Sequence, residues 1–235
     1  SHYPMHNFRC DVPLAAEPEA TLPLLTKALR KRTKKTAIKA HHQALAKRHA
    51  AERRKWHKAA LAEAKRTPIG FQWAARCVGD LLGPNTIVVN EYPLDPRFAP
   101  PTGPGSYFGP SHSAGLGWGF GAALGAKLGA PDKTVICTLG DGSYIFGVPT
   151  ACHQVSRASN LPLLTIVFNN GAWDEVSNST RNVHPNGWAV TTDNFPMVSM
   201  GPPPNFEEIV RAFDGHGERG EDPAELPAAL KRALN

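Results

Sequence analysis

Gly140-Asp141-Gly142-Ser143 and, further along the chain, Asn169-Asn170 are the two polar stretches that decide the fold. Each follows a run of apolar and β-branched residues, 134–139 before the first and 163–168 before the second. Such runs are typical of buried strands in a parallel sheet. The intervening residues 148–159 suffice for one crossover helix, so we predict a strand–helix–strand unit.

Both polar stretches follow the carboxyl ends of these predicted strands, the edge at which open α/β sheets bind ligands. Asp141 and Asn170 would offer hard oxygen ligands there, which suit a Mg²⁺ ion whose shell is completed by phosphate and water. Gly140 and Gly142 would let the backbone approach a diphosphate, and the following helix start would present free N–H groups to it. The alternative is an ordinary strand–helix–strand unit with a Gly-Asp-Gly turn.

The combination of GDGS with the later NN resembles the cofactor motif of thiamine-diphosphate enzymes, in particular the acetolactate synthase, benzoylformate decarboxylase and pyruvate decarboxylase group. The resemblance implies that Asp141, Asn170 and the backbone carbonyl of Ala172 hold Mg²⁺. It implies an α/β fold with a mainly parallel sheet and helices on both faces. It also implies C–C bond cleavage or formation at the carbonyl of a 2-oxo acid, with the cofactor as electron sink.

A further predicted strand, residues 86–90, should end on the same rim at Asn90-Glu91. By resemblance, Glu91 would contact the cofactor together with Gly140, Gly142 and Ser143. Relatives often continue here with Ser or Thr hydroxyls that touch the diphosphate, whereas this chain reads Tyr92-Pro93-Leu94-Asp95. The usual phosphate contact is therefore absent unless the ring of Tyr92 turns inward.

A Gly-rich stretch precedes a predicted helix at 120–128 and reads His112-Ser113-Ala114-Gly115-Leu116-Gly117-Trp118-Gly119. By resemblance, Leu116 would support thiamine in a bent conformation beside Gly115, and the Ala114 carbonyl would accept a hydrogen bond from the aminopyrimidine. Close packing of a Gly-rich helix against the sheet is the alternative.

Two residues are candidates for proton transfer, Glu175 and His112. Glu175 could equally be a solvated acid in the first turn of a helix, where the helix dipole favours it. His112 has no second partner in view in the sequence.

The bulk composition limits the class of protein. The chain has 235 residues, enough for one large domain or for one domain and part of another. No apolar run approaches the length of a membrane span, and no signal peptide opens the chain. The four cysteines are scattered without metal-binding spacing, which indicates a reduced, cytoplasmic protein.

The positive charge is concentrated in one segment. Residues 27–66 hold 15 Lys and Arg against two acids, whereas the rest of the chain holds 11 against 18. We interpret 31–66 as a basic helical linker, with nucleic-acid binding as the weaker alternative. Residues 1–30 resemble the end of the middle domain of the family, and 67–235 resemble its diphosphate-binding domain.

The remaining elements are predicted from local signals. A helix should start at Thr67-Pro68, and residues 178–195 should form a mobile flap or loop. Towards the C-terminus we expect a helix at 205–213, a short edge strand at 216–220 and a final helix at 222–234.

Nothing in the chain corresponds to the family's pyrimidine-binding domain, so the resemblance implies that another domain or chain supplies it, in a homo- or hetero-oligomer. We expect an acetolactate-synthase-like, thiamine-diphosphate- and Mg²⁺-dependent carboligase or decarboxylase of a 2-oxo acid, as the C-terminal part of a larger enzyme. A non-catalytic cofactor-binding or assembly subunit is the alternative. The sequence leaves open the identity of the 2-oxo acid and any need for FAD.

Overall fold

The computed structural model describes residues 11–109, 113, 115–202 and 204–234. The chain forms two compact units, residues 1–54 and 55–235. In the first unit, α1 (Pro18–Arg32) buries no residue, and α2 (Lys35–Ala62) continues across the boundary between the units. No helix in the described part of the chain is both long and apolar enough to span a membrane.

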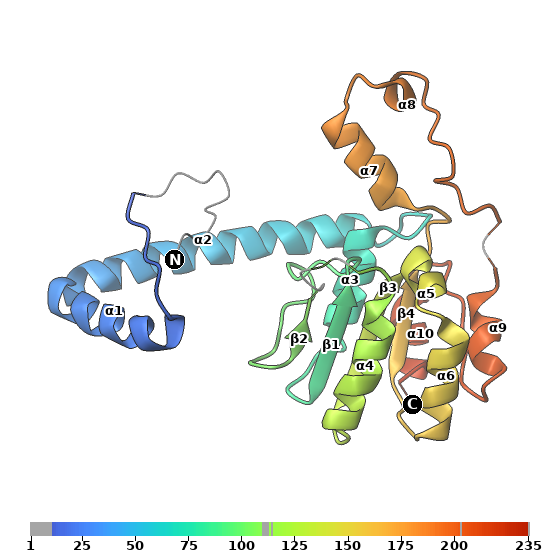
Figure 1. Ribbon diagram of the computed structural model, residues 1–235, viewed down its shortest axis with the longest axis horizontal. Helices are drawn as coiled ribbons and strands as arrows, with labels where there is room; N and C mark the ends of the chain where they lie inside the picture. Colours follow the sequence, from blue (N-terminus) through green and yellow to red (C-terminus); the bar gives the residue numbers. More distant parts are fainter. Residues whose placement is uncertain (1–10, 110–112, 114, 203, 235) are drawn as a thin grey trace. The chain divides into compact units, whose positions relative to one another are not determined.

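The second unit is organised around a four-stranded parallel sheet in the order β2-β1-β3-β4 (Figure 1). The strands are β1 (Thr86–Glu91), β2 (Tyr107–Phe108), β3 (Thr134–Gly140) and β4 (Leu164–Phe168). The three strands that the apolar runs predicted are confirmed, as is the α/β fold with a parallel sheet.

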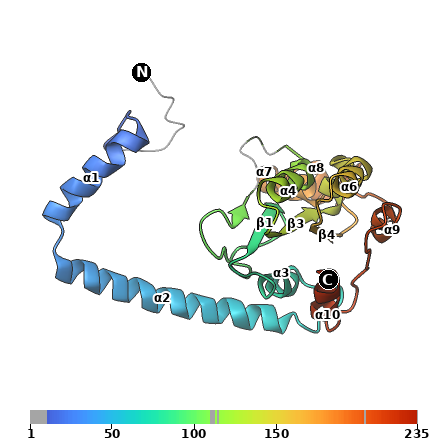
Figure 2. The same ribbon diagram turned by 90° about the horizontal axis from the view of Figure 1, so that it is seen from below.

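Helices cover both faces of this sheet, as predicted (Figures 1 and 2). On one face lie α4 (Trp118–Gly129), α5 (Asp141–Phe146) and α6 (Pro149–Ala158), with α9 (Phe206–Arg211) beside α6. On the other face lie α3 (Phe71–Gly79) and α10 (Leu226–Arg232).

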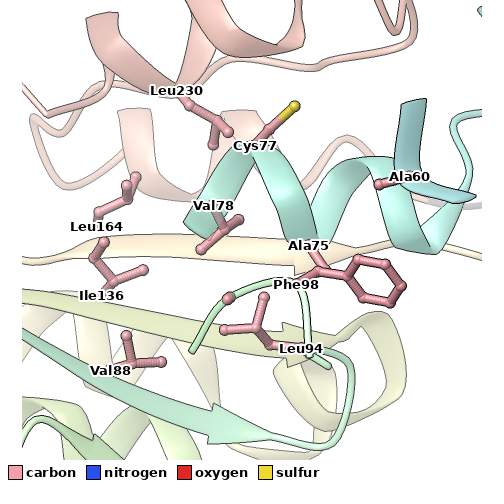
Figure 3. Packing of buried hydrophobic residues seen from close by; sticks show 11 residues of the cluster. Ala60, Ala75, Cys77, Val78, Val88, Leu94, Phe98, Ile136, Leu164 and Leu230 are labelled. Carbon is pink, nitrogen blue, oxygen red and sulfur yellow. The ribbon is translucent and has the colours of Figure 1, made fainter. Parts of the chain in front are cut away.

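Alternation along the strands divides the core into two clusters, because successive side chains point to opposite faces. Val88 and Ile136 pack with Val78 of α3 and Leu230 of α10 (Figure 3). Their neighbours Val89 and Cys137 pack on the opposite face with Phe120 and Ala123 of α4. Burial on both faces explains why these strands are continuous apolar runs.

Three sequence predictions about element bounds are wrong. The helix expected at Thr67-Pro68 starts at Phe71, where the Glu63 carboxylate accepts a hydrogen bond from the backbone N–H of Gln72 at 3.0 Å. The segment 178–195 is not the expected loop, because it holds most of α7 (Asp174–Val183) and all of α8 (Trp188–Thr191), whereas a mobile flap stays a prediction.

The third error concerns 216–220, which forms no strand. This segment packs against α9 instead, where a Cβ on Gly217 would collide with the carbonyl oxygen of Glu207. The guanidinium of Arg211 donates a hydrogen bond to the carbonyl of Gly217 at 2.6 Å. The carbonyl of Gly217 is thus engaged with α9 and not with a neighbouring strand.

A buried carboxylate fixes the start of α4 to the end of β1. Glu91 is fully buried, and its two carboxylate oxygens accept hydrogen bonds from the backbone N–H groups of Gly117 and Gly119, each at 2.6 Å. The first N–H groups of a helix lack partners within the helix and favour a negative charge. Glu91 therefore satisfies the amino end of α4 from within the sheet.

This close approach requires glycine at 119 but not at 121. A Cβ on Gly119 would lie 2.8 Å from a carboxylate oxygen of Glu91, whereas a Cβ on Gly121 would meet nothing within 4 Å. We predict that Gly119→Ala lowers the free energy of unfolding by roughly 1–3 kcal/mol. Gly121→Ala, in the same helix, should raise it by up to about 1 kcal/mol because alanine favours helix. Denaturant unfolding of both variants checks this, and equal effects would contradict it.

A second buried polar contact joins α5 to α6. The hydroxyl of Tyr144 and Nε2 of His153 lie 2.7 Å apart, and both residues are buried. The imidazole packs edge-on against Phe120 and is stacked with Phe213. Burial raises the pKa of Tyr144 to about 12 and lowers the pKa of His153 below its usual 6.5.

The lowered pKa of His153 predicts acid sensitivity. In the unfolded chain His153 takes up a proton near pH 6.5, whereas the folded chain takes it up only at lower pH. The free energy of unfolding should therefore be highest above pH 6.5 and should fall as the pH drops below it. His153→Gln should be less stable than the wild type at about pH 7.5. As the pH falls from about 6.5 to about 5, however, the variant should lose less stability than the wild type. Thermal unfolding across this range checks it, with His184→Gln, which removes an exposed imidazole, as the control.

Candidate functional site

The candidate site lies at the sheet edge where β3 and β4 end. Gly140, the last residue of β3, is paired in register with Phe168, the last residue of β4. Asp141 follows β3 directly as the first residue of α5, and Asn169-Asn170 follow β4. The structure therefore brings the two predicted polar stretches together at one edge.

The carboxylate of Asp141 connects the two stretches. It is 3% exposed, and one oxygen accepts a hydrogen bond from the backbone N–H of Gly142 at 2.8 Å. The other oxygen accepts from the N–H groups of Gly171 at 2.7 Å and Asn170 at 3.2 Å. The loop after β4 is thus held against the start of α5 by a single buried side chain.

The asparagine side chains shape the loop after β4. The side-chain oxygen of Asn169 accepts a hydrogen bond from Gly171 N–H at 3.1 Å, and that of Asn170 accepts from Ala172 N–H at 3.0 Å. Both asparagines are exposed. The carbonyl of Ala172 accepts no backbone hydrogen bond from the described residues, whereas its neighbour Gly171 accepts one from Met200.

A divalent cation fits this set of donors. A carboxylate offers about four lone-pair positions, so Asp141 can accept three N–H groups and still bind a cation. No Lys, Arg or His side chain in the described part of the chain is paired with Asp141. Carboxylate, carboxamide and carbonyl oxygens suit Mg²⁺. The described residues contain no cluster of three His, Cys, Asp or Glu for a metal, so phosphate and water would complete the shell.

Tight packing surrounds the Gly-Asp-Gly turn. A Cβ on Gly142 would collide with the ring of Trp173, whereas a Cβ on Gly140 would come no nearer than 3.9 Å to the hydroxyl of Ser143. Gly142 is therefore required by the chain itself, independently of any ligand. Ser143 is buried within α5.

The other predicted site residues differ in how the structure places them. Both oxygens of Glu91 accept hydrogen bonds from the start of α4, so this carboxylate holds β1 and α4 together. Leu116 is 37% exposed at the start of that helix, and Gly115 is exposed beside it. His112 and Ala114 lie outside the described residues.

Glu175 lies in the first turn of α7 and is exposed. Its carboxylate accepts a hydrogen bond from the hydroxyl of Ser179 at 3.4 Å. This placement agrees with both interpretations of the sequence, a proton-transfer residue and a solvated acid that the helix dipole favours.

Sequence reasoning missed the role of Asn90 at this edge. Its carboxamide is buried and bonds both the N–H and the carbonyl of Leu94, which closes a loop around Tyr92. Tyr92 has a backbone φ of +77°, a left-handed conformation. An asparagine at the end of an otherwise apolar strand is the one sequence feature that points to such a loop.

Comparison with known proteins identifies the domain. Residues 96–235 match the C-terminal TPP binding domain of thiamine pyrophosphate enzymes. A probable acetolactate synthase of Mycobacterium bovis is 34% identical over 119 residues, which are 51% of this chain and 20% of that protein. The 2-hydroxyacyl-CoA lyase 1 of Mus musculus is 34% identical over 126 residues, with the same two shares.

A solved structure agrees with these sequence matches. The thiamine diphosphate-dependent 4-hydroxybenzoylformate decarboxylase of Rhodococcus jostii superposes with a TM-score of 0.59 at 26% identity, covering 73% of this chain and 31% of that one. The chain thus spans about a fifth of the length of the curated relatives that it matches. Because the family match covers more than half of the chain and the parallel sheet carries both motifs at one edge, the chain belongs to the thiamine pyrophosphate enzymes through their C-terminal TPP-binding domain.

Proposed function

We propose that this chain is the diphosphate-binding part of a thiamine-diphosphate- and Mg²⁺-dependent enzyme that cleaves or forms a C–C bond at the carbonyl of a 2-oxo acid. The proposal rests on the buried Asp141 carboxylate, which gathers the N–H groups of Asn170 and Gly171 at the edge where β3 and β4 end. Relatives named as acetolactate synthases and a 4-hydroxybenzoylformate decarboxylase support the class of reaction.

Three groups of the chain would hold the metal, namely the Asp141 carboxylate, the Asn170 side-chain oxygen and the Ala172 carbonyl. Gly140, Gly142 and Ser143 would line the diphosphate, because they surround Asp141 at the start of α5. When bound, thiamine diphosphate would supply the electron sink for the 2-oxo acid. The chain itself would position that group and exclude water from it.

The pyrimidine half of the cofactor would need a second domain or chain. Both oxygens of Glu91 are bonded to α4, Asp141 is committed to the loop after β4, and the Asp174 carboxylate accepts from Ser177 at 2.9 Å. Glu175 is exposed on α7. We propose that the carboxylate that activates the cofactor comes from a pyrimidine-binding partner in an oligomer, where Leu116 and Gly115 face that partner.

We propose that the basic segment 31–66 acts as a linker between the remnant of a middle domain at 1–30 and the diphosphate-binding domain at 67–235. In the unit that begins at residue 55, Trp56 and Ala60 of α2 pack into the cluster around Val78. The end of the basic helix is therefore anchored by apolar contacts, which is expected of a linker that enters a domain.

The metal site predicts the effect of one substitution. Asp141→Asn keeps the size of the side chain and an accepting oxygen but removes the charge, so Mg²⁺-dependent binding of thiamine diphosphate should weaken roughly 100-fold or more. Asn170→Ala should act in the same direction. Titration calorimetry with both ligands measures this. Asp132→Ala, an exposed acid at the opposite end of β3, is the control, and unchanged affinity in Asp141→Asn would refute the assignment.

The missing pyrimidine surface predicts that the pure 235-residue chain is inactive. With Mg²⁺ and thiamine diphosphate it should give no turnover of pyruvate or benzoylformate, because Glu91 and Asp141 are bonded within the fold and the pyrimidine-binding partner would supply the activating carboxylate. Adding the pyrimidine-binding half should restore turnover, which release of CO₂ would report. Steady decarboxylation by the pure chain would show that the chain needs no partner.

A further inference from the structure

One side of α2, a single continuous helix (Figure 2), is a basic face. Residues three, four or seven positions apart lie on the same side of an α-helix. By this spacing the cationic residues of one side within 35–54 are Lys35, Lys39, Lys47, Arg53 and Arg54. All of them are exposed. At 1.5 Å per residue, the basic face is about 30 Å long.

The side chains between these cations are small or polar. Gln43, Ala46 and Ala50 lie among them, and no acid lies on this side of the described helix. The larger apolar residues, Ile38 and Leu45, point away from the basic face by the same helical spacing. The face therefore presents positive charge without the apolar anchors that a protein interface or a lipid layer would use.

The charges of the basic face are not neutralised by the described part of the chain. None of its five Lys and Arg side chains forms an ion pair with a residue that the structure describes. By contrast, all seven arginines beyond residue 67 pair with a carboxylate of the chain. The positive charge of the basic face is thus left for an anion from outside the chain.

The length and the charge of this face match a nucleic acid. Duplex DNA carries one negative charge per about 1.7 Å of its axis, so roughly 18 phosphates lie along about 30 Å. The major groove of B-form DNA admits an α-helix. Small side chains such as Ala46 and Ala50 would let the helix come close to the phosphates on either side of the groove.

We propose that the basic face of α2 binds duplex nucleic acid through its phosphate backbone. The structure adds two observations to the basic composition of the segment, namely that the cations share one side of a helix and that they lack partners among the described residues. The inference does not depend on the proposed function. It is compatible with a linker, because Trp56 and Ala60, which anchor the helix, lie outside the basic face. Phosphate contacts carry no base sequence, so binding should depend on salt and not on sequence.

The salt dependence of binding tests the proposal. Fluorescence anisotropy measures the affinity of the full chain for a labelled DNA duplex of about 20 base pairs, roughly twice the span of the face. Five phosphate contacts predict that the logarithm of the association constant falls with the logarithm of salt concentration at a slope of about −4.5. Arg53→Gln with Arg54→Gln should make this slope shallower by about 2 and weaken binding roughly tenfold or more at about 0.1 M salt.

Two further double variants are the controls. Arg157→Gln with Arg219→Gln removes the same charge from arginines that pair with Asp214 at 2.7 Å and Glu221 at 2.8 Å, so the slope should not change. Arg53→Lys with Arg54→Lys keeps both charges in a helix former and should keep the slope. Circular dichroism checks that all variants retain their helix. The α2 variants should bind thiamine diphosphate with Mg²⁺ like the wild type, so this inference and the proposed function fail separately.

An RNA duplex of the same sequence distinguishes the two sources of phosphate. Equal affinity for both duplexes assigns the contact to the backbone alone. Tighter binding of DNA places the helix in the major groove, because the major groove of A-form RNA is too deep and narrow for side chains.

The inference is overturned if neither duplex binds at about 50 mM salt with up to about 0.1 mM protein, the weak end of non-specific binding. An unchanged slope in Arg53→Gln with Arg54→Gln, or an equal loss in Arg157→Gln with Arg219→Gln, would also overturn it. Binding to vesicles of phosphatidylcholine and phosphatidylserine without binding to either duplex would identify a membrane surface as the partner and refute the nucleic acid.

Discussion

The site depends on the hydrogen bonds that the buried carboxylate of Asp141 accepts from α5 and from the loop after β4. Parallel strands bring their carboxyl ends to one edge, but the loops that leave the edge need a common anchor. Asp141 provides it by accepting hydrogen bonds from Gly142 in α5 and from Gly171 after β4. Because the side chain is buried and has no cationic partner in the described part of the chain, its charge is balanced only by N–H dipoles. A divalent cation would complete that balance.

A second anchored point supports the rim from the neighbouring strand. Glu91 satisfies the first N–H groups of α4, and Asn90 closes the loop that follows β1. Each is a polar side chain buried where a parallel sheet would otherwise be apolar, and each has its hydrogen bonds satisfied within the chain. The rim is therefore held by contacts within the chain itself, as would suit a site that holds a cofactor in one orientation.

The same geometry supports the proposal that the chain acts as part of a larger enzyme. The matched relatives are about five times as long as the segment that they share with it. The edge carries oxygen atoms that would suit a metal and a turn that would suit a diphosphate, while Leu116 is partly exposed. A cofactor held by one end at an open edge needs another surface to bury its other end.

The sequence by itself determined three of the four strands, β1, β3 and β4, their parallel arrangement and the meeting of Asp141 with the loop at Asn170. These follow from local patterns, because apolar runs mark buried strands and parallel strands share their carboxyl edge. Tertiary structure alone decided that Glu91 would hold α4, that Tyr144 would pair with His153 and that Tyr92 would be strained. The tertiary structure also decided that the segment 216–220 packs against α9, where Arg211 bonds the carbonyl of Gly217. Glu91 and Gly117 lie far apart in the chain, so no local pattern encodes their contact.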